Sequence, residues 1–353
     1  MTSIDSGLWD PQPGWLNTAS YGLPPRPAWE ALQAVLRDWQ VGATSWEPWD
    51  GSTTRARESF ARLVGAEVAD VFVGSTVSAA VAPIAAALPD GSRVLVDDIE
   101  FTSNVYPWMV HADRGVEVIA ASTDKFVDAI RPGIDLVAVS AVQSATGTVL
   151  DLAQVVAACK AIDALLVVDA SQAVGWLPLT VDGVDALITH TYKWLMSPRG
   201  ATLGYLSPRL QERCRPLQAG WYAGRNVSGS YYGPQMELAT DARRFDQSPA
   251  WFSFVGAAPA LELIEQIGVE TIHEHNLALA NEFRAGIGLP PGDSAIVSAS
   301  IPGAEEAFAA AGVRAAVRGG NLRASFHVYS TRADVQLALE ALDGLEGLKG
   351  LGK

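Results

Sequence analysis

The sequence is poor in cysteine and has no surplus of basic residues. Only two cysteines, Cys159 and Cys214, occur in 353 residues, which excludes a disulfide-stapled scaffold and is typical of a reducing cytoplasm. The formal net charge of −14 argues against nucleic acid or an anionic membrane as a partner, because both attract clustered Lys and Arg. We therefore expect a cytoplasmic protein with neither partner.

Long apolar runs are also missing. Every apolar stretch is short and interrupted by charge or glycine, so we expect no membrane-spanning helix. Residues 1–15 lack a basic region followed by an apolar run, so we expect no signal peptide. With 49% hydrophobic and 18% charged residues, the chain can bury a large core, and its length favours about two domains.

What the sequence does contain is an alternation of short apolar segments with helical stretches. We expect strands at Val71–Val73, Arg93–Val96, Val116–Ala120, Leu136–Val139, Leu165–Val168, Ala186–Thr189 and Thr202–Leu206. We expect helices at Pro27–Val41, Thr53–Val64, Ser75–Leu88, Ser103–His111 and Leu152–Ala161. Apolar strands that alternate with helices predict an α/β protein with a parallel sheet covered on both faces.

The region Gln218–Pro249 is rich in Gly, Tyr and Arg without a clear period, and we interpret it as long functional loops. The alternation of helices and strands then resumes, which indicates a smaller α/β domain. We expect a large domain over residues 15–250 and a small C-terminal domain over 251–343. We expect residues 1–25 to pack near the functional site and residues 344–353 to form a flexible tail.

Only one of the five lysines is placed for covalent chemistry. Lys193 directly follows an apolar strand and lies among aromatic residues in His190-Thr191-Tyr192-Lys193-Trp194-Leu195. Partly apolar surroundings disfavour the ammonium form and leave a neutral amine for a Schiff base. The alternative is a lysine whose amine reaches the surface, as most lysines do.

Two further features accompany this lysine. Asp169 ends the apolar segment Leu165–Val168, where a carboxylate faces the ligand crevice of an α/β sheet and could keep a pyridine nitrogen protonated. One further strand separates it from Lys193, which is enough chain to bring both to one sheet edge. Gly74-Ser75-Thr76-Val77-Ser78 lies between a strand and a helix and suits a phosphate. Simple helix capping is the alternative for Asp169 and for this turn.

These three features, in this order, resemble the class V aminotransferase family of fold-type I pyridoxal-phosphate enzymes. The family includes cysteine desulfurases, kynureninases, isopenicillin N epimerase and the carbon–sulfur lyase of ergothioneine synthesis. The resemblance covers about Trp15 to Leu342. It is carried by Glu100-Phe101-Thr102-Ser103-Asn104, Asp169-Ala170-Ser171-Gln172-Ala173, Tyr192-Lys193-Trp194-Leu195, Pro198-Arg199-Gly200, Arg244-Phe245-Asp246 and Leu322-Arg323-Ala324-Ser325.

The resemblance implies pyridoxal 5′-phosphate as the cofactor and a mostly parallel, seven-stranded sheet in the large domain. It also implies a homodimer with active sites at the subunit interface. By the same resemblance, Lys193 forms the aldimine and Asp169 partners the pyridine nitrogen. Phe101 stacks on the ring, for which a flat π-face suffices. Gln172 approaches the phenolic oxygen.

The remaining site residues also follow from the resemblance. The residues matched to the phosphate are Thr76, the backbone of Val77, His190, Tyr192 and, from the neighbouring subunit, Ser248. Ser144 stands where many relatives have an asparagine facing the ring. Arg323 matches the arginine that binds the substrate α-carboxylate through its planar guanidinium. Core or surface positions remain the alternatives for His190, Phe101 and Arg323.

The absence of a nucleophilic cysteine from one loop reduces the number of reactions that the family resemblance allows. Cysteine desulfurases need a cysteine on a mobile loop before the carboxylate arginine, and Val317-Arg318-Gly319-Gly320-Asn321 has none. Cys159 lies in the expected helix Leu152–Ala161 and Cys214 in one expected at Leu210–Arg215, and both are interpreted as structural. We hypothesise β-elimination from a cysteine conjugate or a related β-substituted amino acid, with aminotransfer and epimerisation as alternatives.

Three substrate contacts and one alternative class of function complete the predictions. Trp221 and Tyr222 indicate an apolar substrate side chain, and Arg318 would bind a second acidic group. A non-catalytic cofactor-binding sensor is the alternative of a different class, although no basic helical DNA-binding module is evident.

His273 and His275 are two apart on an expected helix and point different ways. We therefore expect a solvated face there and no metal.

Overall fold

The structure, a computed structural model, describes residues 4–345. A seven-stranded sheet lies at its centre, in the order β1-β7-β6-β5-β4-β2-β3. Its strands are β1 (Val71–Gly74), β2 (Arg93–Asp97), β3 (Glu117–Ala121), β4 (Leu136–Ser140), β5 (Leu165–Asp169), β6 (Ala186–His190) and β7 (Thr202–Leu206). The neighbours from β3 to β6 run parallel, whereas β7 is antiparallel to both β1 and β6. The predicted mostly parallel sheet is confirmed.

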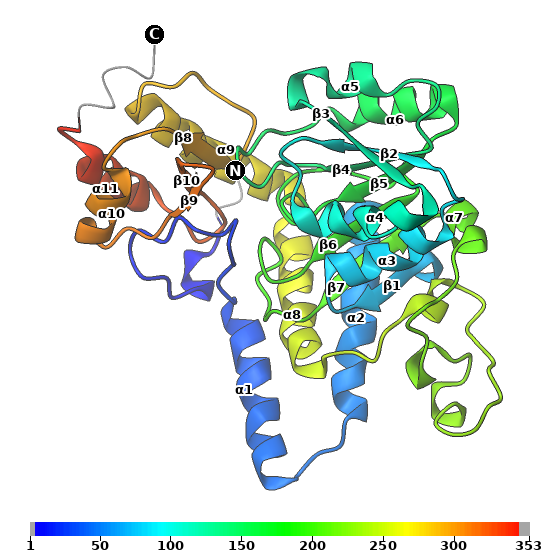
Figure 1. Cartoon of the computed structure of the whole chain (residues 1–353). Helices are drawn as coiled ribbons and strands as arrows, with labels where there is room; N and C mark the ends of the chain where they lie inside the picture. The colour runs from blue at the N-terminus through cyan, green and yellow to red at the C-terminus, as the bar shows by residue number, and fades with distance from the viewer. Residues whose placement is uncertain (1–3, 346–353) are drawn as a thin grey trace.

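Helices cover both faces of this sheet (Figure 1). One face packs on α2 (Glu47–Val64), α5 (Phe126–Ala129), α6 (Leu152–Ile162) and α8 (Trp251–Ile267), and the other on α3 (Val77–Ala87), α4 (Tyr106–Met109) and α7 (Pro208–Arg213). Successive side chains of a strand point to opposite faces. Leu95 of β2 accordingly enters the first core, while Val94 and Val96 enter the second. Burial on both faces explains why these strands are apolar throughout.

A smaller unit lies beside the large sheet. Strands β8 (Ile296–Ala299), β9 (Ala316–Arg318) and β10 (Asn321–Ser325) form an antiparallel sheet in the order β8-β10-β9. Its helices are α9 (Val269–Gly286), α10 (Ala304–Ala311) and α11 (Arg332–Leu342). Phe283, Phe308 and Phe326 lie in a core of its own. This arrangement agrees with the α/β alternation expected after residue 250.

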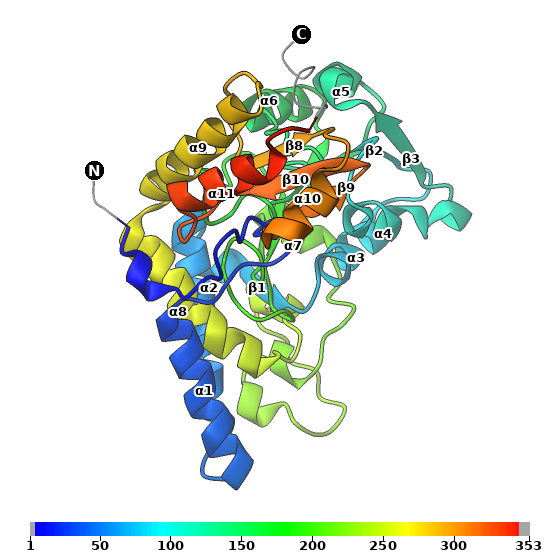
Figure 2. The same cartoon turned by 90° about the vertical axis from the view of Figure 1, so that its left-hand side faces the viewer.

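The N-terminal segment connects the two sheets (Figure 2). Leu16 is buried in the small core, and its N–H donates to the Arg314 carbonyl at 2.8 Å. Further along, the Gly22 N–H donates to the Tyr192 carbonyl, beside Lys193, at 2.9 Å. Helix α1 (Arg26–Val41) then packs on α8. Residues near 20 therefore lie against both the small sheet and the loop after β6.

The division into domains at residues 15–250 and 251–343 remains a proposal. Helix α8 packs on α1 and α2 and shares the core of the large sheet, which favours a boundary nearer Gly268, where α8 ends. The predicted flexible tail, residues 344–353, lies outside the described residues except for Gly344 and Leu345.

Two predicted helices differ from the observed ones. Helix α2 begins at Glu47, not Thr53, because Pro48 and the acidic Glu47 and Asp50 suit a first helical turn. The expected helix over Ser103–His111 is a 3-10 turn at Thr102–Asn104 followed by the short α4. Pro107 lies in the first turn of α4, where its missing N–H does no harm, but it cannot continue an earlier helix.

None of the helices within residues 4–345 is by itself both long and apolar enough to cross a membrane. Helices α8 and α9 meet the criterion only together, and they are bent by 83° to each other.

Candidate active site

Lys193 and Asp169 lie at the ends of two neighbouring parallel strands. Asp169 is the last residue of β5 and pairs in register with Ile188 of β6. Strand β6 ends at His190, and Lys193 follows three residues later. Both side chains are buried, with 5% of Asp169 and 8% of Lys193 exposed. The predicted meeting of these two groups at one sheet edge agrees with the register of the strands.

The surroundings of Lys193 favour its neutral amine. Burial lowers the pKa of Lys193 to about 8, and the positive charges of Arg323, Arg199 and Arg318 act in the same direction. The carboxylate of Asp169 opposes this shift. Since an ordinary lysine has a pKa of about 10.4, a much larger fraction of this amine is neutral near pH 7.

Two aromatic rings flank the amine. Lys193 Nζ lies 5.6 Å from the centre of the Phe101 ring and 5.8 Å from that of Tyr192. Phe101 is 51% exposed, so it is not the core aromatic that its apolar character alone would favour. An open ring face beside a buried lysine is what a stacked pyridine ring requires.

A row of strand ends places the predicted phosphate residues together. Gly74 at the end of β1 pairs with Thr202 of β7, and Thr202 in turn pairs with His190 of β6. Thr76 then caps α3, its hydroxyl accepting from the Ala79 N–H at 3.2 Å, and Val77 is the first residue of that helix. The N-terminus of α3 therefore faces the edge where His190 lies, and its free N–H groups suit an anion.

His190 is neutral in this site. Its Nδ1 lies 3.1 Å from the Thr202 hydroxyl, and its ring centre lies 5.0 Å from that of Tyr192. Burial lowers the pKa of His190 to about 4; the carboxylate of Asp169 opposes this shift, and the charges of Lys193 and Arg199 favour it. His190 can therefore donate a hydrogen bond to a phosphate oxygen, but it brings no positive charge at neutral pH.

Gln172 and Ser144 form a hydrogen-bonded hub. The Gln172 Oε1 accepts from Trp194 Nε1 at 2.8 Å, and its Nε2 donates to the Ala19 carbonyl at 3.0 Å and to Ser144 Oγ at 3.1 Å. Ser144 also accepts from Arg323 Nη1 through its carbonyl and its hydroxyl. This hub links the loop after β5 to the small domain.

Arg323 extends from β10 of the small sheet into this hub. It is only 1% exposed, which excludes a surface strand position. Its Nη2 donates to Ser20 Oγ at 2.9 Å, and its buried Nε has no hydrogen-bond partner within residues 4–345. No ion pair with Arg323 is present in that part of the chain. A buried, unpaired guanidinium of this kind is suited to an anionic ligand.

Sequence reasoning missed a buried carboxyl group beside the ring site. The Glu100 carboxylate accepts from the Ser140 N–H at 2.7 Å, from the Ser140 hydroxyl, and from the Phe101 N–H at 3.0 Å. Ser140 pairs in register with Asp169. Burial raises the pKa of Glu100 to about 7, helped by the nearby Asp169. The signal available in the sequence was a glutamate directly before the stacking residue.

Other predicted residues lie apart from this centre. Trp221 packs against Trp46, with ring centres 5.6 Å apart, and the Tyr222 hydroxyl donates to Asp50 at 2.6 Å. Neither residue forms a hydrogen bond or an aromatic contact with Lys193 or Arg323 among the described residues 4–345, and their role toward the substrate stays a prediction. Ser248 is exposed, and its expected contact with a neighbouring subunit also stays a prediction.

Arg318 lies on β9 and is exposed, with its Nη1 donating to the carbonyl of Val317. Its charge contributes to lowering the pKa of both Lys193 and Arg323. It is therefore close enough to act on the site electrostatically, while its assignment to a second acidic group of the substrate remains a prediction.

The expectation of a solvated histidine face on α9 is wrong. His273 stacks on Trp176 with ring centres 5.7 Å apart. His275 is partly buried, and its Nε2 lies 3.1 Å from the Ser330 carbonyl. Both rings face neighbouring elements because α9 packs between the small core and the large domain.

Gly22 holds the N-terminal segment against the lysine loop. A Cβ atom at this position would lie 2.0 Å from the Lys193 carbonyl oxygen, far inside any normal contact. We expect Gly22→Ala to lower kcat/KM at least about tenfold and the free energy of unfolding by about 1–3 kcal/mol, because the backbone beside Lys193 must shift. Steady-state kinetics and denaturant unfolding measure the two effects.

Gly51→Ala is the matched control for Gly22→Ala. Gly51 lies on the exposed side of α2, and a Cβ there would meet nothing within 4 Å. We expect this control to leave activity unchanged and to stabilise the helix by about 0.5–1 kcal/mol. Equal kinetics for the two variants would contradict the proposed close contact.

The residues present fit pyridoxal 5′-phosphate. Asp169 accepts from the Ser171 N–H through Oδ1 at 2.8 Å, and its Oδ2 has no hydrogen-bond partner within residues 4–345. Asp169 would hold the pyridine nitrogen, Phe101 would cover the ring, and Lys193 would bond the aldehyde carbon. The N-terminus of α3 and His190 would hold the phosphate.

Comparison with known proteins identifies the same family that the sequence motifs resemble. The family model "Aminotransferase class-V" matches residues 50–300. An uncharacterised aminotransferase of Bacillus subtilis is 30% identical over 260 residues, covering 70% of this chain and 68% of the relative. Isopenicillin N epimerase of Streptomyces clavuligerus is 27% identical, covering 96% of both chains.

A solved structure shows the same fold. The complex of the cystine C–S lyase C-DES with its product cysteine persulfide superposes with a TM-score of 0.84 at 19% identity, covering 95% of this chain and 98% of the other. The chain therefore belongs to the class-V aminotransferase family, and it is an enzyme whose cofactor is pyridoxal 5′-phosphate.

Proposed function

We propose that this enzyme is a carbon–sulfur lyase that removes the β-substituent of a cysteine conjugate or a related β-substituted amino acid. The observation that carries the proposal is a buried lysine amine with a pKa of about 8, opposite an unpaired buried arginine, in a site without a reactive thiol. The similar fold of a cystine C–S lyase supports it.

Each residue has a defined task in this proposal. Arg323 binds the α-carboxylate through its unpartnered Nε and one of its terminal nitrogens. Lys193 Nζ accepts the proton from Cα, since its lowered pKa suits a general base near neutral pH. Asp169 holds a positive charge on the pyridine nitrogen. When bound, the cofactor supplies an electron sink for the charge that develops at Cα.

The overall reaction breaks the bond between Cβ and sulfur. The electron pair of that bond leaves with sulfur, which takes up a proton to become a thiol. One water molecule is consumed, and the rest of the substrate leaves as pyruvate and ammonium. No external oxidant or reductant is needed.

The thiols of this chain argue against a desulfurase that forms a persulfide on the protein. Cys159 and Cys214 are both buried, and burial raises the pKa of each thiol to about 12. A nucleophilic cysteine must be a thiolate and must be accessible. Neither cysteine meets these conditions.

We also propose a homodimer in which Ser248 reaches the phosphate site of the neighbouring subunit. Ser248 is exposed in this chain and lies two residues after the buried Asp246, which fixes the start of this loop through the Val73 N–H.

Product analysis tests the proposed reaction. We expect the enzyme, supplied with cysteine conjugates, to release pyruvate and thiol in equal amounts without an added keto acid. Transfer of the amino group that depends on a keto acid would indicate an aminotransferase instead. Exchange of the Cα proton with inversion, and no pyruvate, would indicate an epimerase.

A further inference from the structure

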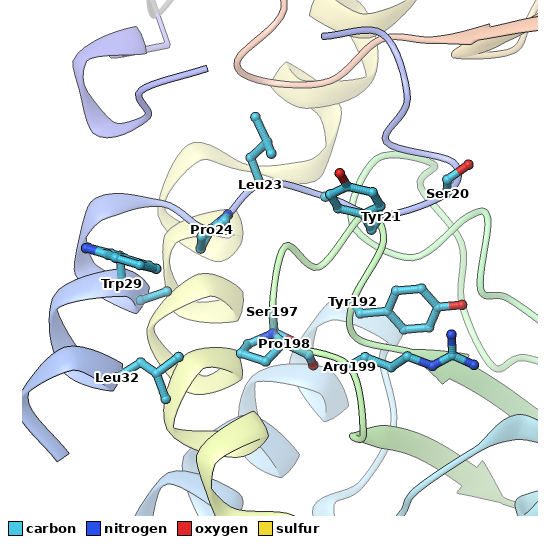
Figure 3. Close-up of a pocket in the computed structure, with 12 residues that line it drawn as sticks. Ser20, Tyr21, Leu23, Pro24, Trp29, Leu32, Tyr192, Ser197, Pro198 and Arg199 are labelled. Atoms are coloured by element: carbon cyan, nitrogen blue, oxygen red, sulfur yellow. The ribbon is translucent and has the colours of Figure 1, made fainter. Parts of the chain in front are cut away.

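A cavity of about 490 Å³ adjoins the active site on the side of α1. Figure 3 shows its lining side chains. They come from the N-terminal segment, from the first half of α1 and from the loop between β6 and β7. This volume is within the range of small-molecule sites, roughly 300–1,000 Å³.

Two of these residues connect the cavity to the reacting groups. The Ser20 hydroxyl accepts from Arg323 Nη2 at 2.9 Å, and the Tyr192 ring lies 5.8 Å from Lys193 Nζ. A substrate held by Arg323 and Lys193 therefore has its Cα near one end of the cavity. The cavity is a continuation of the substrate site.

The far end of the cavity is apolar. In Figure 3, Leu23, Pro24, Trp29 and Leu32 gather at the α1 end, while Tyr192 and Arg199 lie at the opposite end. Trp29 and Tyr21 expose 53% and 50% of their surfaces. Covering such large apolar side chains with a ligand is favourable, because it removes apolar surface from water.

Arg199 is the only charged side chain among the lining residues. Its guanidinium carbon lies 5.2 Å from the centre of the Tyr192 ring, and it forms no ion pair with a carboxylate within residues 4–345. This positive charge at the near end opposes a cationic substituent. The lining therefore favours an apolar substituent and disfavours a cationic one.

We propose that this cavity binds the β-substituent of the substrate and that this substituent is a neutral, bulky apolar group on sulfur, such as an aryl or arylalkyl thioether. The inference rests on the proposed lyase function, and it names the substrate class for that site. Arg199 and Tyr192 then flank the sulfur-proximal part, and the apolar group lies against Leu32 and Trp29.

Three substrates and the intact holoenzyme test the substrate class. We expect kcat/KM for S-benzylcysteine to exceed that for S-methylcysteine by about 10- to 100-fold, mostly through KM, because the larger group fills an apolar pocket. S-(2-aminoethyl)cysteine should be the poorest of the three. Equal values for the benzyl and methyl substrates would overturn the proposal.

A variant whose new side chain fills the cavity, and a matched variant on the same helix, test the assignment. Leu32→Trp places a large ring in the cavity, while Ala34→Trp places the same ring on the exposed side of the same helix. We expect Leu32→Trp to remove at least tenfold of the preference for the benzyl substrate and Ala34→Trp to leave it unchanged. Identical preferences in the two variants would contradict the assignment.

A binding measurement separates this inference from the proposed reaction. 3-(Benzylthio)propanoate lacks the amine and cannot react, so calorimetry reports only its fit to Arg323 and the cavity. We expect wild type to bind it at least tenfold more tightly than 3-(methylthio)propanoate, and Leu32→Trp to lose this difference. That result without any pyruvate release would refute the lyase but keep the cavity. Equal binding of both acids, or a change of oligomeric state in Leu32→Trp without a change in binding, would overturn the cavity assignment.

Discussion

Lys193→Ala is expected to lower kcat/KM roughly 10⁴-fold or more. The substitution removes the amine that we propose holds the cofactor and accepts the Cα proton, and a positioned base alone contributes about 10²–10⁴-fold. The same variant should lose the visible absorption of the lysine-bound cofactor. Steady-state assays and an absorption spectrum of the purified protein measure both effects.

The control for this variant is Lys125→Ala. Lys125 is exposed and follows β3, the edge strand that is three strands away from β5, so kinetics and spectrum should match wild type. A small added amine such as methylamine should restore part of the activity of Lys193→Ala, because it can take up the proton in the space left by the side chain. Undiminished turnover of Lys193→Ala would remove the basis of the proposed function.

The strand pattern made the central pair of residues predictable. A buried parallel strand that ends in a carboxylate, followed one strand later by a lysine among aromatics, indicates that both groups lie at the carboxyl edge of one sheet. The register of Asp169 with Ile188 agrees with this expectation. The local sequence was sufficient because the geometry of adjacent parallel strands determines which residues meet.

The direction of β7 could also have been predicted from chain length. Only residues 191–201 separate β6 from β7, and a parallel connection needs a crossover of a dozen or more residues, usually a helix. Lys193 and Trp194 occupy that loop. Because this short loop contains Lys193 and no crossover helix, β7 must run antiparallel to β6.

The contacts of the N-terminal segment were not predictable in the same way. Ser20 meets Arg323 across 303 positions of sequence, and Gly22 lies against Lys193 without any local motif that signals it. Such contacts depend on how the small domain packs on the large one, which periodicity does not report. The cavity beside α1 is formed by the same long-range packing, so no sequence pattern predicts it.

The sequence also did not show which aromatic residues line the site, because this too depends on long-range packing. Trp221 and Tyr222 were predicted at the substrate, yet within this chain Tyr222 hydrogen-bonds to Asp50 at the start of α2. Trp29, which no motif singled out, lines the cavity beside the site. Composition indicates that aromatics gather near a site, but only tertiary structure shows which ones line it.

Asp246→Asn is expected to destabilise the protein by about 3–5 kcal/mol. Asp246 and Arg57 form an ion pair at 2.6 Å, with 2% and 6% of their side chains exposed. Asparagine keeps the shape of the side chain but leaves a buried guanidinium without a counter-charge, which is strongly unfavourable. Denaturant unfolding of the apoprotein measures the loss. Glu117→Gln, in an exposed pair with Arg93, is the control and should cost less than about 1 kcal/mol.

The same substitution should weaken cofactor binding, because Asp246 also fixes the strand that leads to the phosphate turn. Its carboxylate accepts from the Val73 N–H at 2.8 Å, one residue before Gly74. Combining Asp246→Asn with Arg57→Met removes the unpaired charge and keeps an acceptor for Val73, so the double variant should recover most of the lost stability and affinity. If the double variant recovers stability but not affinity for the cofactor, the charges of Arg57 and Asp246 matter for phosphate binding more than the hydrogen bond from Asp246 to β1 does. A double variant no more stable than Asp246→Asn would show that the unpaired charge is not the cause of the loss.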